Sequence, residues 1–411
     1  MTRLLLVEPE ATGHRMVLYV RLMAVEAIRR GWKVTLMTTA SALAHSATQS
    51  VISALASDLD IQRMPEIPRE TRSGKLQLLF GQRAYLRTFE QAYREYRKTN
   101  AVDFVYVPYL NYIDKIVGLY GSPFGTAPFG GMILAAKFHH QACGIAGPRG
   151  KMDVVNSVLF KRLLSLRALT LATTIDEPLP KYVKLNMPAL AGKIRYVPDV
   201  SFIEKPAQRL TARRALGLEE GHFVIASYGS LSPRKGLARI LSMFSMADLP
   251  GHFRLVLAGV QDAEAARLIQ SFMSKAGARR SQVILMNKFC SELEEGWVFA
   301  AADAMWLCYE NFSGMSGVLI QSAQAGVPVI TSNYGLIDHN RAKNSLGLRW
   351  DDFLLAASPV PRFDWEKLET IVHSIKGSSQ LANFARQHSP DKFGSNVMDA
   401  IGHVHRMEGR A

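Results

Sequence analysis

Two adjacent cations, Arg234 and Lys235, follow a short apolar run in the stretch YGSLSPRKGLARIL. Gly229 and Ser230 end that run, and a helical pattern begins at Gly236. An arginine can bind a diphosphate as a planar fork and a lysine can bind it as a point charge, so this loop predicts a diphosphate site. Its residue order is not the GxxxxGK[ST] order of a P-loop. The alternative interpretation is a solvated basic helix start.

A second loop brings small residues to the start of another helix, in the stretch ENFSGMSGVLIQSAQAGVPVI from 310 to 330. Backbone N–H groups at a helix N-terminus can donate to an anion, and small residues let a phosphate approach them. Gln321 lies one turn inside, where we expect its amide to hold a ribose hydroxyl. The loop residues expected to line a donor are Ser313, Gly314, Ser316 and Gly317. A glycine- and serine-rich turn before a core helix is the alternative.

A third loop, EPEATGHRMVLYV, follows the first apolar run of the chain. Gly13 permits a tight turn and a close approach to the backbone, and the helix start after it can receive an anion. We expect Gly13 and His14 on the acceptor or phosphate side of the site. A capping or surface role for His14 is the alternative. The loop lacks the GxGxxG order, so it does not predict a dinucleotide site.

The elements that must position these loops are short runs rich in Val, Ile and Leu, alternating with helical patterns. Such runs are typical of parallel strands that helices cover on both faces, which predicts the α/β class. The pattern lapses at 200–222 and then resumes. We therefore predict two doubly wound, Rossmann-like domains at 1–200 and 201–390, facing across a cleft, and a helix at 391–411 that packs back on the first. Ligands of such sheets bind outside the carboxyl ends of the strands.

Composition and net charge limit the kinds of partner that we expect this protein to bind. The chain has 411 residues, 48% of them hydrophobic, and a net charge of +14. Residues 1–200 hold 26 Lys and Arg against 15 Asp and Glu, hence +11, while residues 201–411 hold 23 against 20, hence +3. A basic first half suits a phosphorylated lipid, an anionic membrane surface or nucleic acid. No nucleic-acid motif is present, so we expect no nucleic acid. Cys143, Cys290 and Cys308 have no metal-ligand spacing, and we expect no metal.

Two basic amphipathic stretches, 75–98 and 151–169, could lie on an anionic membrane. The alternative is that both are core-facing helices with solvated basic faces. The sequence has no run of 18 apolar residues, so we expect no membrane span. The N-terminus resembles a first strand more than a secretory signal. We therefore expect a cytoplasmic protein with a peripheral position at the inner face of the membrane.

On these motifs the second half resembles the retaining GT-B glycosyltransferases, in particular glycosyltransferase family 4. GSLSPRKG at 229–236 is similar to the family's G-x-x-x-x-(R)KG segment, and SAQAGVPVITSNYG at 322–335 is similar to EAMAxGxPVIxxxxG. LVLAG at 255–259 and AADAMWLCYENFSG at 301–314 also match its run of elements. The resemblance implies the GT-B fold, with an acceptor-binding first domain and a nucleotide-sugar-binding second domain.

One departure concerns the family's Glu-x₇-Glu, whose second Glu binds the ribose and whose first lies near the donor sugar. Aligned here, the second position is Gln321 and the first is Ser313, with Glu310 three residues earlier. Either Glu310 takes over the first role or that role is lost. The family also places a histidine near the transferred sugar, and His139 or His140 in AAKFHHQACG matches it. The resemblance does not choose between the two.

The resemblance implies a metal-independent enzyme without a cofactor. It would move a sugar from a nucleotide-diphosphate donor to a glycan or lipid-linked acceptor, in polysaccharide or glycolipid assembly, with retention of configuration. Arg234, Lys235 and the N–H groups at 316–317 would stabilise the departing diphosphate. The base would bind near 287–289, where Phe289 stands. Two other hypotheses stay open: a catalytically weak GT-B-like assembly protein that binds a nucleotide or glycan, and an inverting enzyme or sugar-phosphate epimerase on the same scaffold.

Overall fold

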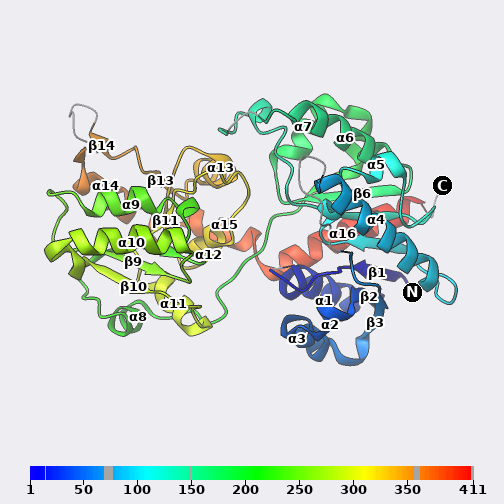
Figure 1. Ribbon diagram of the computed structural model, residues 1–411, viewed down its shortest axis with the longest axis horizontal. Helices are drawn as coiled ribbons and strands as arrows, with labels where there is room; N and C mark the ends of the chain where they lie inside the picture. The colour runs from blue at the N-terminus through cyan, green and yellow to red at the C-terminus, as the bar shows by residue number, and fades with distance from the viewer. Residues whose placement is uncertain (14, 69–76, 148–149, 356–361, 409–411) are drawn as a thin grey trace. The chain divides into compact units, whose positions relative to one another are not determined.

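The computed structural model describes residues 1–411 except His14, 69–76, 148–149, 356–361 and 409–411. The expectation for His14 therefore falls outside the described residues. The chain divides into two compact units (Figure 1). Unit 1 comprises Met1–Gly144, Pro148–Asp199 and Pro390–Ala411, and unit 2 comprises Ile145–Gly147 and Val200–Ser389.

Unit 1 is built on a seven-stranded sheet in the order β3-β2-β1-β4-β5-β6-β7, in which every pair is parallel. The chain runs outward in one direction from β1 and in the other from β4, so the doubly wound switch point lies between these two strands. The strands are β1 (Arg3–Val7), β2 (Lys33–Thr39), β3 (Leu59–Met64), β4 (Phe104–Val107), β5 (Phe129–Ile133), β6 (Leu169–Thr174) and β7 (Ile194–Tyr196).

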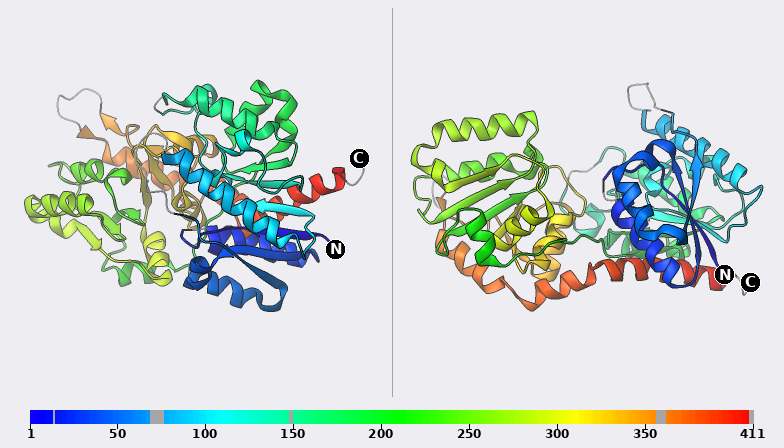
Figure 2. Two further views of the ribbon diagram at one scale, coloured as in Figure 1. Left: turned by 45° about the vertical axis from the view of Figure 1, so that its right-hand side comes forward. Right: turned by 90° about the horizontal axis from the view of Figure 1, so that it is seen from below.

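The last helix of the chain belongs to unit 1 and packs along its first helix (Figure 2). The ring of Tyr19 stacks on Phe393 at 5.0 Å, and Arg30 Nη1 lies 2.8 Å from Asp399 Oδ1. The helices of unit 1 are α1 (Arg21–Arg29), preceded by a π-helical turn η1 (Arg15–Val20), α2 (Ala40–Ala44), α3 (Ser46–Leu55), α4 (Gln77–Tyr96), α5 (Val117–Tyr120), α6 (Asp153–Ser165), α7 (Pro178–Asn186) and α16 (Pro390–Glu408).

Unit 2 has a six-stranded parallel sheet in the order β10-β9-β8-β11-β12-β13, with its switch point between β8 and β11. Its strands are β8 (Phe223–Tyr228), β9 (Phe253–Ala258), β10 (Val283–Met286), β11 (Ala304–Leu307), β12 (Val329–Thr331) and β13 (Gly347–Arg349), with a short antiparallel pair of β14 (Leu354–Leu355) and β15 (Arg362–Phe363). Its helices are α8 (Arg209–Ala215), the 3₁₀ turn η6 (Pro233–Lys235), α9 (Leu237–Phe244), α10 (Ala263–Lys275), α11 (Glu292–Ala301), α12 (Gly317–Gln324), α13 (Gly335–Asn344), α14 (Trp365–Ile375) and α15 (Ser379–Gln387).

The central strands are buried almost without alternation, because helices cover both faces of each sheet. In β1 the four residues after Arg3 are 0–1% exposed, and all four residues of β11 are likewise 0–1% exposed. The predicted α/β class, with two doubly wound parallel sheets, is confirmed.

A buried carboxylate joins the helices of unit 2 to the start of β11. Asp303 accepts hydrogen bonds from Arg213, Arg209 and Lys376 at 2.6–2.7 Å and from the backbone N–H of Val224. Burial acts to raise the pKa of Asp303, but the Lys376 ammonium and the other donors outweigh it and hold that pKa below its usual range. This carboxylate therefore stays ionised and ties α8 and the end of α14 to the sheet.

Replacing Asp303 by Asn should lower the stability of unit 2, because three cations then lose their shared counter-charge. Breaking a buried ion pair in this way costs about 3–5 kcal/mol. Urea denaturation of the full chain, followed by tryptophan fluorescence, measures the change. Glu95→Ala, which removes an exposed pair with Lys98, is the control and should change stability by less than about 0.5 kcal/mol. Equal midpoints for Asp303→Asn and wild type would contradict the prediction.

Candidate functional site

The turn after β8 forms the tightest part of the unit 2 site. Gly229 has a φ of +95°, and a Cβ there would stand 3.1 Å from Lys235 Nζ. Gly259, with a φ of +139°, packs against it, because its Cβ would lie 2.0 Å from Gly229 O. Ser230 follows in the same turn. Only glycine fits at these two positions, so the turn holds its backbone open beside the lysine.

Lys235 is a buried lysine, with 5% of its surface exposed. Its Nζ donates to the carbonyl of Tyr228 and, at 3.1 Å, to the Tyr309 hydroxyl. The backbone carbonyl of Lys235 accepts the indole N–H of Trp306 at 3.1 Å, which fixes the turn to β11. The ends of β8 and β11 therefore hold the ammonium at the switch point of the sheet.

Arg234 lies beside this lysine and rests on aromatic rings. Its guanidinium stands 4.6 Å from the Phe312 ring centroid and 5.7 Å from that of Tyr309. Among the residues that the structure describes, neither Arg234 nor Lys235 makes an ion pair with a carboxylate. Two neighbouring cations without a counter-charge make this edge of unit 2 a receptor for an anion.

The loop between β11 and α12 is tied to the same cations. The N–H of Glu310 donates to Arg234 O at 2.7 Å, and Ser313 O accepts from the N–H of Leu336 at 3.1 Å. Ser316 is the extended residue before α12, and its side chain makes no capping hydrogen bond. Gly317 then begins the helix, so the sequence-predicted residues from Ser313 to Gly317 lie together at a helix N-terminus, with Gly314 between them.

Glu310 turns toward Arg239. Its Oε1 lies 3.9 Å from Arg239 Nη2, and Arg239 in turn covers the Trp350 ring at 4.6 Å. The side chain of Glu310 is 45% exposed. Its expected role beside the donor sugar stays a prediction, as does the base-binding role of Phe289, whose side chain is 89% exposed after β10.

Gln321 is engaged by its own unit. Its Nε2 donates to Glu295 Oε1 at 2.8 Å and to Phe202 O at 3.1 Å. The hydroxyl of Tyr228 also hydrogen-bonds Glu295. Sequence reasoning missed Glu295. The available signal was weak: the capping box Ser291–Glu294 marks the start of α11, and Glu295 is the last of the three acidic residues in its first turn.

In unit 1, His139 and His140 are buried, with 0% and 5% exposed. Both Nε2 atoms approach Asp176 Oδ2, at 3.1 and 2.8 Å. Burial acts to raise the pKa of Asp176, and the two neighbouring imidazoles lower it below the usual range. Sequence reasoning missed Asp176, which follows β6 and belongs to a different element from the histidines.

These three side chains are also the group within the described residues that could hold a metal, because their ligand atoms lie within 4.8 Å of one another. Two imidazoles and one carboxylate suit a transition metal. The expectations of no metal, and of a histidine beside the donor sugar, both stay predictions.

The loop after β1 borders a hollow of about 540 Å³ outside the carboxyl ends of β1 and β4. Arg15 Nη2 lies 2.7 Å from Glu10 Oε2, and its guanidinium covers the rings of Tyr109 and Tyr112 at 4.7 and 5.3 Å. Gly13 has a φ of +73°, with open space where a Cβ would stand. This is the switch point of unit 1, where doubly wound sheets bind ligands. The aromatic residues of this hollow escaped sequence reasoning.

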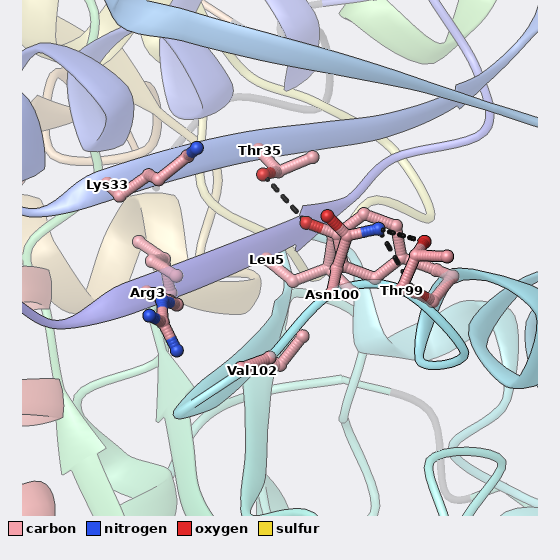
Figure 3. A pocket seen from close by; sticks show the side chains of 10 residues that line it. Arg3, Leu5, Lys33, Thr35, Thr99, Asn100 and Val102 are labelled. Carbon is pink, nitrogen blue, oxygen red and sulfur yellow. Dashed lines mark hydrogen bonds between the residues drawn. The ribbon is translucent and has the colours of Figure 1, made fainter.

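A second hollow of unit 1, of about 350 Å³, lies at the amino ends of β1 and β2 (Figure 3). Thr35 Oγ1 is hydrogen-bonded to Tyr96, Asn100 to Thr99, and Lys33 pairs with Asp60 at 3.0 Å. These polar groups already have partners, and the hollow opens at the sheet edge opposite the switch-point loops. We therefore leave it outside the candidate site.

Glu8, at the bottom of the unit 1 switch point, should make stability depend on pH. Burial raises its pKa to about 7, against the lowering effects of Arg15 and of the Tyr112 hydroxyl that donates to Oε1 at 2.6 Å. The folded state therefore keeps a proton that the unfolded state releases near pH 4.5. The contribution of Glu8 to stability is complete below that pH and falls by about 3 kcal/mol as the pH rises through 7.

The variant Glu8→Gln keeps the acceptor for Tyr112 and removes the titration. Its free energy of unfolding should fall less steeply between pH 5 and 7 than that of the wild type, as measured by urea denaturation at several pH values. Asp60→Asn, at an exposed pair with Lys33, serves as control and should keep the wild-type slope. Equal slopes for Glu8→Gln and wild type would show that Glu8 does not hold the proton.

Part of the chain is similar to a known protein family, and nearly all of it is similar to solved structures. Residues 208–347 match the family model of the glycosyl transferases group 1. A search of curated proteins found no significant match. Several solved structures share the fold along nearly the whole chain.

The sucrose-phosphate synthase of Thermosynechococcus elongatus has 16% identity and a TM-score of 0.59, with 100% of this chain and 98% of that chain covered. Anabaena HepE in complex with UDP-glucose has 13% identity and a TM-score of 0.63, with 98% and 100% covered. WaaG, a glycosyltransferase involved in lipopolysaccharide biosynthesis, has 14% identity and a TM-score of 0.52, with 95% of each chain covered.

At these identities the structural likeness shows the fold alone. The match to the family model concerns the segment that contains Arg234, Lys235 and Gln321. The chain therefore has the GT-B fold, and its segment 208–347 is similar to the glycosyl transferases group 1.

Proposed function

We propose that this protein is a retaining, metal-independent glycosyltransferase that moves a sugar from a nucleoside-diphosphate donor to a glycan or lipid-linked acceptor, in polysaccharide or glycolipid assembly. The observation that supports it best is the buried Lys235, which has a carbonyl and a phenol as partners and, within the described residues, no carboxylate. Burying an ammonium without a counter-charge is costly. A diphosphate at this position would supply the missing charge.

Three groups would bind that diphosphate together. Lys235 offers a point charge, Arg234 a planar fork on the Phe312 ring, and the start of α12 its free N–H groups. The structure of Anabaena HepE with UDP-glucose supports a nucleotide sugar as the donor. UDP is therefore the first nucleotide to test.

The same groups would drive the reaction. Negative charge grows on the diphosphate as the glycosidic bond breaks, so cations already fixed in place stabilise the transition state more than the ground state. Two cations can fill the role of a metal ion. Retention would proceed by front-face departure, with the leaving phosphate taking the proton of the acceptor hydroxyl. Glu310 faces Arg239, which leaves no carboxylate of this loop assigned as a nucleophile.

The acceptor would bind unit 1, at the switch-point hollow beside Gly13. Tyr85, Tyr109 and Tyr112 line that hollow, and aromatic faces are suited to the apolar face of a sugar ring. Glu10 and Arg15 offer polar contacts for hydroxyl groups. This arrangement supports a glycan part in the acceptor.

An anionic membrane surface would bind α6. This helix buries Phe160, Leu163 and Leu164, yet it leaves Val154, Val155 and Val158 exposed at 78%, 43% and 51%. The exposed cations Lys151, Lys161 and Arg162 flank these valines. An apolar strip with a basic rim favours the interfacial interpretation over the core-facing one. A peripheral position at the cytoplasmic face of the membrane is thus part of the proposal.

The basic helix α4 has a weaker claim to that surface, because Arg94 and Lys98 pair with Glu90 and Glu95 on the same helix. The described helices include none that is long and apolar enough to cross a membrane.

A second candidate is a catalytically weak binding protein for assembly. The observation in its favour is that Ser313 stands at the acidic position of the family while Glu310 turns to Arg239. Incubation with UDP-, GDP- and ADP-sugars distinguishes the two. Release of the nucleoside diphosphate supports the enzyme, and its absence with every donor supports the binding protein.

Nucleotide binding should depend on Lys235. UDP, GDP and ADP are titrated in a thermal-shift assay, and the nucleotide that binds should raise the wild-type midpoint with the logarithm of its concentration. Lys235→Met should abolish that rise, and Arg234→Ala should reduce it. Chelation with EDTA should leave the wild-type shift unchanged. Lys98→Met is the matched control, because its side chain is 62% exposed in unit 1 and its ammonium pairs with Glu95. An undiminished shift in Lys235→Met would refute the diphosphate site.

Membrane binding should depend on the valine strip of α6. Val154→Glu/Val158→Glu should weaken cosedimentation with vesicles of anionic phospholipid about tenfold or more, because two charges replace buried methyl groups at the interface. Leu185→Glu, on α7, is the control, since it is 82% exposed outside the strip. Neutral vesicles should retain little of either protein. The membrane proposal fails if the double variant binds anionic vesicles as the wild type does.

A further inference from the structure

Glu295 occupies the point where three elements of unit 2 meet. It lies in the first turns of α11, accepts from Gln321 of α12 at 2.8 Å and hydrogen-bonds Tyr228, the last residue of β8. Tyr228 directly precedes the Gly229 turn, and its carbonyl binds Lys235. The carboxylate is therefore linked to both elements that would bind a diphosphate.

Gln321 has no amide hydrogen left for a ligand. The Nε2 group donates to Glu295 and to Phe202 O, at 2.8 and 3.1 Å, and an amide has only two such hydrogens. What Gln321 does is hold the carboxylate of Glu295 in place. For a ribose hydroxyl that must donate, the neutral amide oxygen of Gln321 is the weaker acceptor, and the charged carboxylate of Glu295 beside it is the stronger one.

The location fits a ribose. Gln321 lies one helical turn, about 6 Å, below the N-terminus of α12 where the phosphates would bind. In a nucleoside diphosphate the ribose is bonded directly to the inner phosphate. A group behind the phosphate-binding turns, between Tyr228 and Gln321, therefore meets the sugar rather than the phosphates.

The chemistry of Glu295 also fits. It is half-buried, and within the described chain it has two neutral donors and no cation as ion-pair partner. Burial raises its pKa, and the nearby Glu204 and Glu292 raise it further, while Tyr228 and Gln321 lower it. The vicinal 2′- and 3′-hydroxyls of a ribose are two donors at the spacing of one carboxylate, which has only acceptors.

We propose that Glu295 binds the ribose diol of the nucleoside-diphosphate donor, with Gln321 and Tyr228 as its positioning residues. The acidic group that the family resemblance would put at 321 has thus moved to the neighbouring helix, and the amide has taken its old place. This inference rests on the proposed donor site, and it adds the group that distinguishes a ribonucleotide from a deoxynucleotide.

Isothermal titration calorimetry of the full-length protein tests it with UDP, or with GDP or ADP if one of these binds instead, and with the 2′,3′-dideoxy form of the same nucleotide. Glu295→Gln keeps the size of the side chain and should weaken the ribonucleotide about 10- to 100-fold, the loss expected for hydrogen bonds to a charged group. It should leave the dideoxy affinity within about threefold. The double variant Glu295→Gln/Gln321→Glu restores the pair in reverse and should recover most of the ribonucleotide affinity.

Glu292→Gln, on the same helix but in an exposed pair with Lys205, is the control and should bind as the wild type. Unchanged ribonucleotide affinity in Glu295→Gln overturns the inference, and so does an equal loss for both nucleotides, which would indicate a structural role. If Lys235→Met loses binding while Glu295→Gln does not, the donor site stands and only the ribose assignment falls. If the wild type binds none of the three nucleotides, the donor site falls and the ribose assignment with it.

Discussion

The buried ammonium of Lys235 is the constraint on which the unit 2 site depends. Its two partners, Tyr228 O and the Tyr309 hydroxyl, belong to the ends of β8 and β11, which are neighbours at the switch point. A Cβ at Gly229 would crowd the ammonium, and a Cβ at Gly236 would lie 2.3 Å from Cys308 O. Gly229 therefore leaves room for the Lys235 ammonium, and Gly236 lets the loop pack against β11. The same absence of side chains leaves the backbone accessible to an anion.

The fold could be predicted because its signals are local. Each strand is a short apolar run, and β1 and β11 are buried along nearly their whole length, so the sequence alone shows two series of covered strands. The loop for which we predict a diphosphate site could be recognised in the sequence for the same reason. Gly229, Arg234 and Lys235 lie within seven residues, and a glycine turn beside two cations indicates an anion site without knowledge of the fold.

The residues that sequence reasoning missed are those whose role depends on a contact with a residue far away in the sequence. Glu295 reaches Gln321 across 26 positions, Asp176 reaches His140 across 36, and Tyr112 reaches Glu8 across 104. No short motif encodes such contacts, because helices and strands of a doubly wound sheet bring them together only after the sheet has formed. Glu310 shows the converse: its place in the chain suggested the donor sugar, while its carboxylate faces Arg239.

The arrangement of charge around α12 has a consequence for the reaction. With Ser313 and Gln321 in place of two acids, no carboxylate of α12 or its entry loop pairs with Arg234 or Lys235. Glu310 faces Arg239, and Glu295 lies on α11 beside Gln321. In the proposed reaction, negative charge grows on the diphosphate as its bond to the sugar breaks, so two unopposed cations would stabilise the transition state more than the resting donor. Because the guanidinium of Arg234 rests on the Phe312 ring at 4.6 Å, this cation would need little reorganisation as that charge develops.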